Sequence, residues 1–317
     1  MKALKSIITI FLLVLFAHFS MAQEQDTTSP KKPKHKPVIN PWFSSSLIDA
    51  QTSFTPKKGD LEFVIHHRFT SVENGISDLF GFYGASNIRL GLNYGITDKL
   101  MIGFGTERDK KMQEFLVKYQ ILQQSRDKII PISLTFYGNT CINARETDYW
   151  GNDYTFTNRL SYFSQIIVSR KWNSKFSTLL GFGYAHINKV DSYRIVTEDS
   201  ISETISYYPK YYNDAIGLSI GGRFKINSTF SLIAQFEQPF ALGHSGHGPH
   251  NHGVVPEKVE AKPNVALGFD ITTVTHSFQL FASSYRAIIP QNNLIMNNFD
   301  FTDKNGIMLG FNIIVKF

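Results

Sequence analysis

The chain has 317 residues, a formal net charge of +6 and 14% aromatic residues, including 27 Phe and 14 Tyr, yet its mean hydropathy is −0.15. A single cysteine, Cys141, excludes a fold held by intrachain disulfides, and part of the positive charge lies in an N-terminal lysine-rich stretch, which argues against nucleic-acid binding. Beyond the N-terminal segment no run of about 18 apolar residues occurs, which excludes a helical membrane protein unless that segment is its anchor. Strands that alternate between lipid and a polar lumen would combine high aromatic content with low mean hydropathy.

The N-terminal segment has the features of a secretory signal. Lys2 and Lys5 precede an apolar stretch, residues 6–19, and Ser20-Met21-Ala22 resembles a signal-peptidase site. A start-anchored transmembrane helix is the alternative, but the apolar stretch is about 14 residues long and a span needs about 20. The sequence therefore predicts a signal peptide over 1–22, a disordered periplasmic leader over 23–41, and one folded domain over 42–317.

A period-two pattern dominates the folded domain. From Leu61 to Phe69, apolar side chains alternate with Glu62, Val64, His66 and Arg68, as on the two faces of a strand. Similar patterns predict further strands at 87–94, 100–105, 115–122, 129–139, 157–170, 176–188, 213–226, 229–240, 264–273, 276–288 and 306–317. Pro131 fits poorly inside one of them, because proline cannot donate a ladder hydrogen bond. The segment 43–55 fits neither pattern and is predicted to be a short plug or a terminal helix.

The connections alternate in length. Long ones at 71–85, 140–156, 189–212, 241–263 and 289–305 are interleaved with tight turns, for example at Thr97-Asp98 and Asn227-Ser228. Outer-membrane barrels have short periplasmic turns and long outer loops, and an even strand number places both termini in the periplasm. We therefore predict an all-β transmembrane antiparallel barrel of about twelve strands. A secreted β-sandwich also alternates, but it explains neither the loop alternation nor strands of about ten residues.

The C-terminal strand ends on an aromatic residue. Ile307, Leu309, Phe311, Ile313 and Val315 share one face with Phe317, while Gly310, Asn312 and Lys316 share the other. This ending resembles the terminal-aromatic signal by which the barrel-assembly machinery recognises outer-membrane barrels. Phe317 is therefore the predicted assembly signal, with that machinery and outer-membrane lipid as expected partners.

A family resemblance rests on three neighbouring stretches: His66–Phe69, Asp78–Gly84 and Asn87–Leu100. Together they resemble an uncharacterised outer-membrane β-barrel family of Bacteroidota, most clearly between Trp42 and Ile132. The resemblance implies fold and location, and it carries no ligand or reaction.

Charged side chains on the polar faces of the strands are the candidate site. They are predicted to line the lumen: Glu62, His66, Arg68, Arg89, Lys118, Arg223, Glu237, Asp270 and Lys316. Two interpretations stay open, a polar and weakly anion-attracting path or a filling of salt bridges that satisfies buried groups.

A histidine-rich run lies in one predicted outer loop, between Gly243 and Gly253. Four imidazoles, His244, His247, His250 and His252, are ligands suited to a divalent metal such as zinc or copper. The alternative is a solvated, flexible loop tip, since glycine and proline flank every histidine. No other cofactor is predicted.

The sequence gives little support to an enzyme, because neither an H-E-x-x-H nor a Walker-type pattern occurs.

Two functional hypotheses remain. The first is an outer-membrane channel or uptake protein for a small solute. The second is a binding or structural barrel that engages a surface partner through its long loops, which are rich in tyrosines such as Tyr207 and Tyr211.

Overall fold

The computed structural model describes residues 35–39, 41–150, 154–199, 202–243 and 256–317. The chain divides into two compact units, 1–36 and 37–317, and the second contains the fold. The predicted signal peptide and the first part of the predicted leader lie outside the described residues. The last residues of that leader contact the fold, where Val38 N donates to Gln124 O at 2.9 Å.

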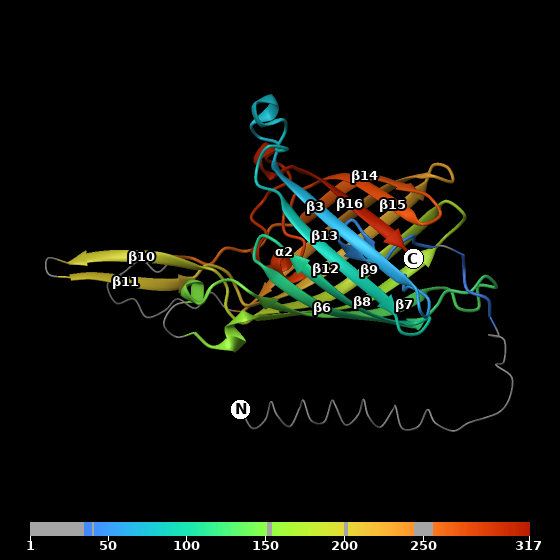
Figure 1. Cartoon of the computed structure of the whole chain (residues 1–317), viewed down its shortest axis with the longest axis horizontal. Coiled ribbons are helices and arrows are strands. Elements are labelled where there is room, and N and C mark those ends of the chain that lie inside the picture. The colour runs from blue at the N-terminus through green and yellow to red at the C-terminus, as the bar shows by residue number, and fades with distance from the viewer. Residues whose placement is uncertain (1–34, 40, 151–153, 200–201, 244–255) are drawn as a thin grey trace, which may run out of the picture. The chain divides into compact units, whose positions relative to one another are not determined.

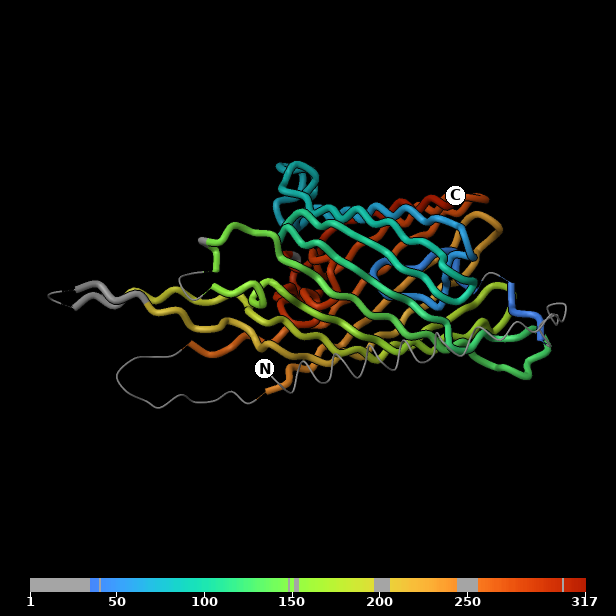
Figure 2. Tube along the Cα trace, turned by 60° about the horizontal axis from the view of Figure 1, so that its bottom comes forward, coloured from blue at the N-terminus to red at the C-terminus, as the bar shows by residue number. Residues whose placement is uncertain are grey.

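The described residues form a closed antiparallel barrel of twelve strands (Figures 1 and 2). The strands are β3 (Leu61–Ser71), β4 (Asn87–Gly95), β5 (Leu100–Glu107), β6 (Met112–Leu122), β7 (Ser133–Asn143), β8 (Leu160–Lys171), β9 (Phe176–Ile187), β12 (Asp214–Lys225), β13 (Phe230–Leu242), β14 (Asn264–Thr272), β15 (His276–Ser283) and β16 (Met308–Lys316). The first and last close the ring, with Ile65 opposite Ile313. The predicted fold class is therefore confirmed.

Side chains alternate along each wall strand as the sequence pattern predicts. On β3, Glu62, Val64, His66 and Arg68 are buried inside, while their neighbours on the outer face are partly exposed. Outward residues are mainly apolar, and Leu267 is 56% exposed near the middle of β14. Because lipid covers such a belt in a membrane barrel, its apolar side chains need no protein partner.

Long and short connections alternate around the barrel. Four-residue turns join β4 to β5 and β8 to β9, whereas the connection from β9 to β12 contains a hairpin of β10 (Ser192–Asp199) and β11 (Ser202–Pro209). This hairpin extends away from the barrel (Figure 1), and no strand was predicted there. Pro131 lies before β7, so the predicted strand at 129–139 is shifted to 133–143 and the proline needs no ladder bond.

Two segments fill the barrel interior. The first is residues 42–55, here called the plug, which contains the two-residue strands β1 (Ser46–Leu47) and β2 (Ala50–Gln51). The plug alternative predicted for 43–55 thus holds, and the terminal-helix alternative does not.

Short 3-10 turns occur in several loops, at η1 (Gly75–Asp78), η2 (Thr147–Trp150), η3 (Phe156–Arg159) and η4 (Lys304–Gly306).

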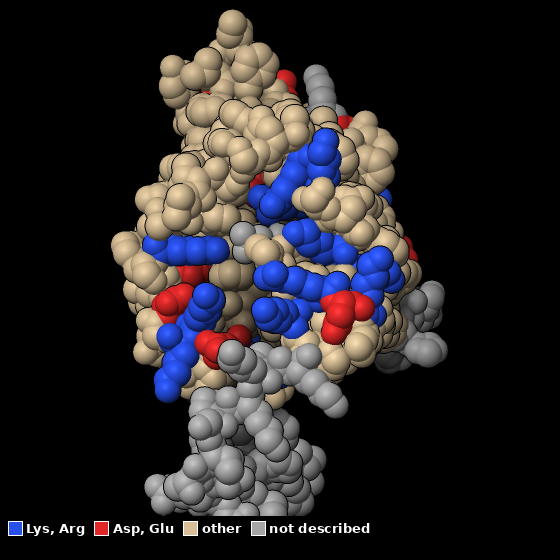
Figure 3. Space-filling view, turned by 90° about the vertical axis from the view of Figure 1, so that its right-hand side faces the viewer, with Lys and Arg blue, Asp and Glu red and all other residues tan. Residues whose placement is uncertain are grey.

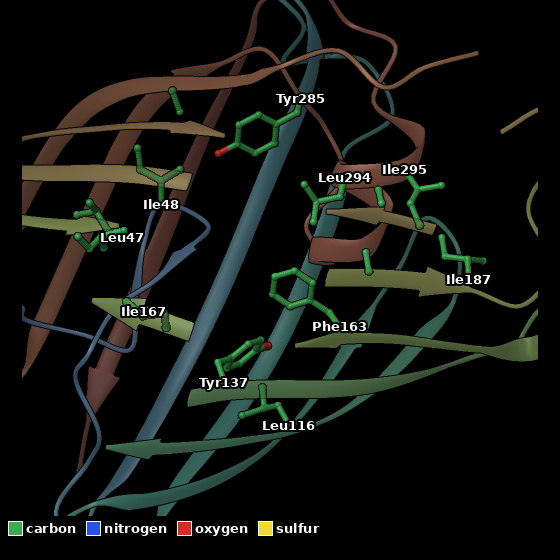
Figure 4. Close-up of a cluster of buried hydrophobic side chains, with 14 of the residues drawn as sticks. Leu47, Ile48, Leu116, Tyr137, Phe163, Ile167, Ile187, Tyr285, Leu294 and Ile295 are labelled. Carbon is green, nitrogen blue, oxygen red and sulfur yellow. The ribbon is translucent and has the colours of Figure 1, made fainter. Parts of the chain in front are cut away.

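The second filling segment corrects a prediction. Residues 289–305 were expected to form an outer loop, but they contain the helix α2 (Pro290–Met296), which packs against β8, β9, β12 and β13. Its Leu294 and Ile295 join a buried apolar cluster that also includes Leu47 and Ile48 of the plug (Figure 4). Burial of these apolar side chains stabilises the position of this loop inside the barrel.

Candidate functional site

The plug is attached to the barrel wall through its backbone. Gln235 Oε1 accepts from the N–H groups of Asp49 and Ala50 at 3.0 and 2.9 Å. Asn312 Nδ2 donates to Ile48 O, and Ile48 N donates to Gln279 Oε1 at 2.9 Å. Buried peptide groups require such partners, because no water reaches them. Amide side chains of the wall therefore replace the strand partners that the two-residue strands lack.

An ion pair joins the plug to β3. Arg68 Nη2 lies 2.6 and 2.8 Å from the two carboxylate oxygens of Asp49, and the side chains are 0% and 9% exposed. Arg68 also donates to Asn312 Oδ1 at 2.9 Å and stacks over the Phe281 ring at 4.4 Å. Loss of either charge would leave the other buried without compensation.

Three further wall residues hold the first part of the plug. Lys118 Nζ donates to Ser45 O at 2.6 Å, and Lys316 Nζ donates to Phe43 O. Glu62 Oε1 accepts from Ser45 N at 3.0 Å. These three charged groups thus bind peptide groups of the plug.

Other predicted lumen residues pair within the wall. Arg89 is bonded through Nε to Glu114 at 2.8 Å, and Arg89 Nη1 lies 3.3 Å from His66 Nδ1. Arg223 lies 3.4 Å from Asp270, whose carboxylate also accepts from Ser277 at 2.5 Å. These pairs correspond to the salt-bridged filling that the sequence left open.

A small chamber separates the plug from α2. It is lined by Asp49, Gln235 and Glu237, together with Asn293 of α2. Glu237 accepts from Asn264 Nδ2 at 2.8 Å. In the described residues the chamber is the space left between the two filling segments, so both segments obstruct the lumen.

Two adjoining pockets lie at the long-loop end of the barrel, and the first is the narrower one. Asn292 and Met296 of α2 line both, as do Lys110 and Asp191. Burial lowers the pKa of Lys110, although Asp191 at 3.1 Å opposes the shift. Burial alone would raise the pKa of Asp191, but the Lys110 ammonium and hydrogen bonds from Tyr149 and Lys110 outweigh it and lower that pKa.

The structure places all nine predicted lumen residues on the inner side of the wall, in separate clusters. Their partners were mostly missed. Glu114 would have followed from extending the alternation of β6 by one residue before Phe115. The sequence did not identify Asp49 as a partner of Arg68, because the plug has no periodic pattern of apolar and polar residues.

Other predicted or possible motifs have plain outcomes. The sequence Gly217-Leu218-Ser219-Ile220-Gly221 spells G-x-S-x-G, but it lies within β12, whereas a nucleophile elbow lies at a strand-to-helix turn. The histidine-rich run, His244 to His252, lies outside the described residues. Among those that are described, no group of three His, Cys, Asp or Glu has the geometry of a metal site, and none of their helices has the length and apolarity of a membrane span.

The comparison with protein families supplies the decisive observation. Residues 42–317 match the family described as a membrane-bound β-barrel domain, DUF5777. The chain belongs to this family. The apolar outer belt of the closed barrel therefore faces lipid, and the polar clusters described above lie within the interior of a membrane protein.

Solved structures give weaker likenesses. The NanC porin is 13% identical with a TM-score of 0.45, and the match covers 81% of this chain and 98% of the porin. The KdgM porin is 5% identical with a TM-score of 0.43, covering 80% and 99%. An outer membrane channel from Pseudomonas putida F1 is 11% identical with a TM-score of 0.44, covering 84% and 97%. No curated protein matches the sequence.

Proposed function

We propose that this DUF5777 barrel admits a small solute across the outer membrane, and that the plug must move for the solute to pass. The observation that carries the proposal is the chemistry of the plug contacts. Besides the apolar contacts of Leu47 and Ile48, wall side chains hold the plug by hydrogen bonds to its backbone and by the ion pair of Arg68 with Asp49. Polar contacts of this kind can be exchanged for water, which makes a displaced plug accessible.

The test compares the intact barrel with a variant that lacks the plug, residues 42–55. Both are reconstituted in planar bilayers, and single-channel conductance is measured in the same salt. We expect low or intermittent conductance for the intact barrel and a larger, steadier conductance without the plug. Absence of conductance from both folded proteins would reject the channel.

A second candidate function is binding of a surface partner through the long loops. The β10–β11 hairpin favours it, because it extends from the barrel and Tyr207 on it is 67% exposed. Pull-down with the intact protein and with a variant lacking residues 192–209 would test this function. Equal recovery of partners by both proteins would count against it.

The orientation and assembly follow the sequence predictions as part of the proposal. Both termini lie in the periplasm of a Bacteroidota cell, after removal of the signal peptide. Phe317, whose backbone pairs with Leu61 at 2.9 Å, is proposed as the assembly signal. Deletion of Phe317 should lower the amount of barrel in outer-membrane fractions, whereas deletion of the hairpin tip should not.

The histidine-rich run stays a proposed zinc or copper site. Replacement of His244, His247, His250 and His252 by alanine should abolish saturable uptake of either metal by the purified protein. Unchanged stoichiometry in that variant would reject the site.

A further inference from the structure

We propose that the narrower of the two pockets at the long-loop end binds the oxyanion, carboxylate or phosphate, of a small anionic solute. The inference deepens the proposed function, on which its physiological meaning rests, by naming the class of solute. It starts from an imbalance of charge. Four cationic side chains, Lys110, Arg145, Arg159 and Lys189, line this pocket, and among the residues that the structure describes Asp191 is the one carboxylate that lines it.

The single carboxylate is already shared. Asp191 lies 3.1 Å from Lys110 Nζ and 3.8 Å from Arg145 Nη2, and it accepts a hydrogen bond from Tyr149. In the described part of the chain, Asp191 is not paired with Arg159 or Lys189. Two cations of the pocket therefore remain without a carboxylate partner there.

Those two cations are held by neutral oxygens. Arg159 Nη1 donates to Asn143 O at 2.8 Å, and Arg159 Nε donates to the Tyr154 hydroxyl at 2.6 Å. Lys189 Nζ donates to Trp150 O. Carbonyl and hydroxyl groups fix the position of a cation but do not neutralise it. The pocket therefore keeps positive charge that a bound anion would neutralise.

A further donor lies in the same lining. Trp150 is 2% exposed, and its indole Nε1 has no hydrogen-bond partner in the described structure. An unpaired buried N–H is costly unless a partner arrives. Guanidinium, ammonium and indole N–H groups are all donors, which matches an oxyanion and mismatches a cation.

The neighbouring pocket provides room for the remainder of the solute. It shares Lys110, Asp191, Asn292 and Met296 with the basic pocket and is also lined by Glu107, Asp109 and Arg286, so it suits an uncharged part of the solute. At the opposite end of the barrel, lysines and arginines also gather on the surface (Figure 3). Positive charge at that end attracts anions toward the barrel.

The test uses the purified full-length barrel in detergent, titrated by calorimetry with succinate, with inorganic phosphate and with the uncharged erythritol. We expect saturable binding of at least one anion, which also identifies the oxyanion, and no binding of erythritol. Arg159→Gln and Lys189→Gln should each weaken binding by about tenfold or more, since charge-assisted hydrogen bonds are lost. Arg194→Gln removes an exposed cation of the β10–β11 hairpin and should leave affinity unchanged.

Several results would overturn the site. One is no binding of either anion by the folded barrel, and another is equal weakening by Arg159→Gln and Arg194→Gln. If Arg159→Gln fails to fold, Lys189→Gln and the charge-retaining Arg159→Lys decide the matter. Conductance without anion binding would overturn the site alone, whereas anion binding without conductance, even after plug deletion, would overturn the channel alone.

Discussion

The buried pair of Arg68 and Asp49 is the residue-scale contact that fixes the plug. Asp49→Asn should weaken plug docking by about 3–5 kcal/mol, because Arg68 would stay buried without a counter-charge. Hydrogen exchange of residues 42–55, followed by mass spectrometry, measures the change. Asp303→Asn, which alters an exposed loop carboxylate, is the control and should leave exchange of the plug unaltered.

Asp191 predicts a pH-dependent contact in the loops. Its folded pKa is depressed by Lys110 and Tyr149, so the contact contributes stability above the ordinary carboxyl pKa of about 3.9, and this contribution is lost as pH falls through the lower folded value. Limited proteolysis between residues 144 and 213 should therefore accelerate below about pH 4. Asp191→Asn should remove that acceleration, and an equally steep pH profile in this variant would contradict the assignment.

At the scale of elements, α2 depends on a close approach to β12. A Cβ at Gly217 would lie 2.5 Å from Leu294 Cδ2, so Gly217→Val should displace α2 from the wall. Exchange of residues 290–296 should increase, while that of the plug should change less. Gly222→Val, on the same strand, is the matched control, since a Cβ there meets nothing within 4 Å. Equal effects of the two variants would mean that strand perturbation, and not contact with Leu294, is responsible.

At the scale of the whole molecule, the barrel depends on its lipid-facing belt. Leu267→Arg should cost about 2–4 kcal/mol of folding stability in vesicles, because it places a charge on the apolar outer face. Ile76→Arg is the control, since Ile76 is 83% exposed in the loop after β3. Urea titrations of both variants in the same lipid measure the difference. Similar losses would indicate that residue 267 does not face hydrocarbon.

The sequence by itself determined the wall of this barrel. The period-two pattern is local, so residues such as Glu62 and Arg68 on β3 are assigned to one face from their neighbours alone. The same locality explains why the alternation of long and short connections, and hence the strand number, was readable without a structure. Strand ends were less certain, as at Pro131, because turn geometry and register also depend on the partner strand.

The tertiary structure alone decided what fills the barrel and where its charges go. Ile48 bonds to Gln279, 231 positions away, and Arg159 and Lys189, which come from separate loops, both contact Trp150. Neither the plug nor α2 has a periodic sequence pattern from which its contacts with the wall could be predicted. Closure of the ring brings these distant segments together inside one enclosed space, and the need to satisfy buried polar groups there selects the contacts.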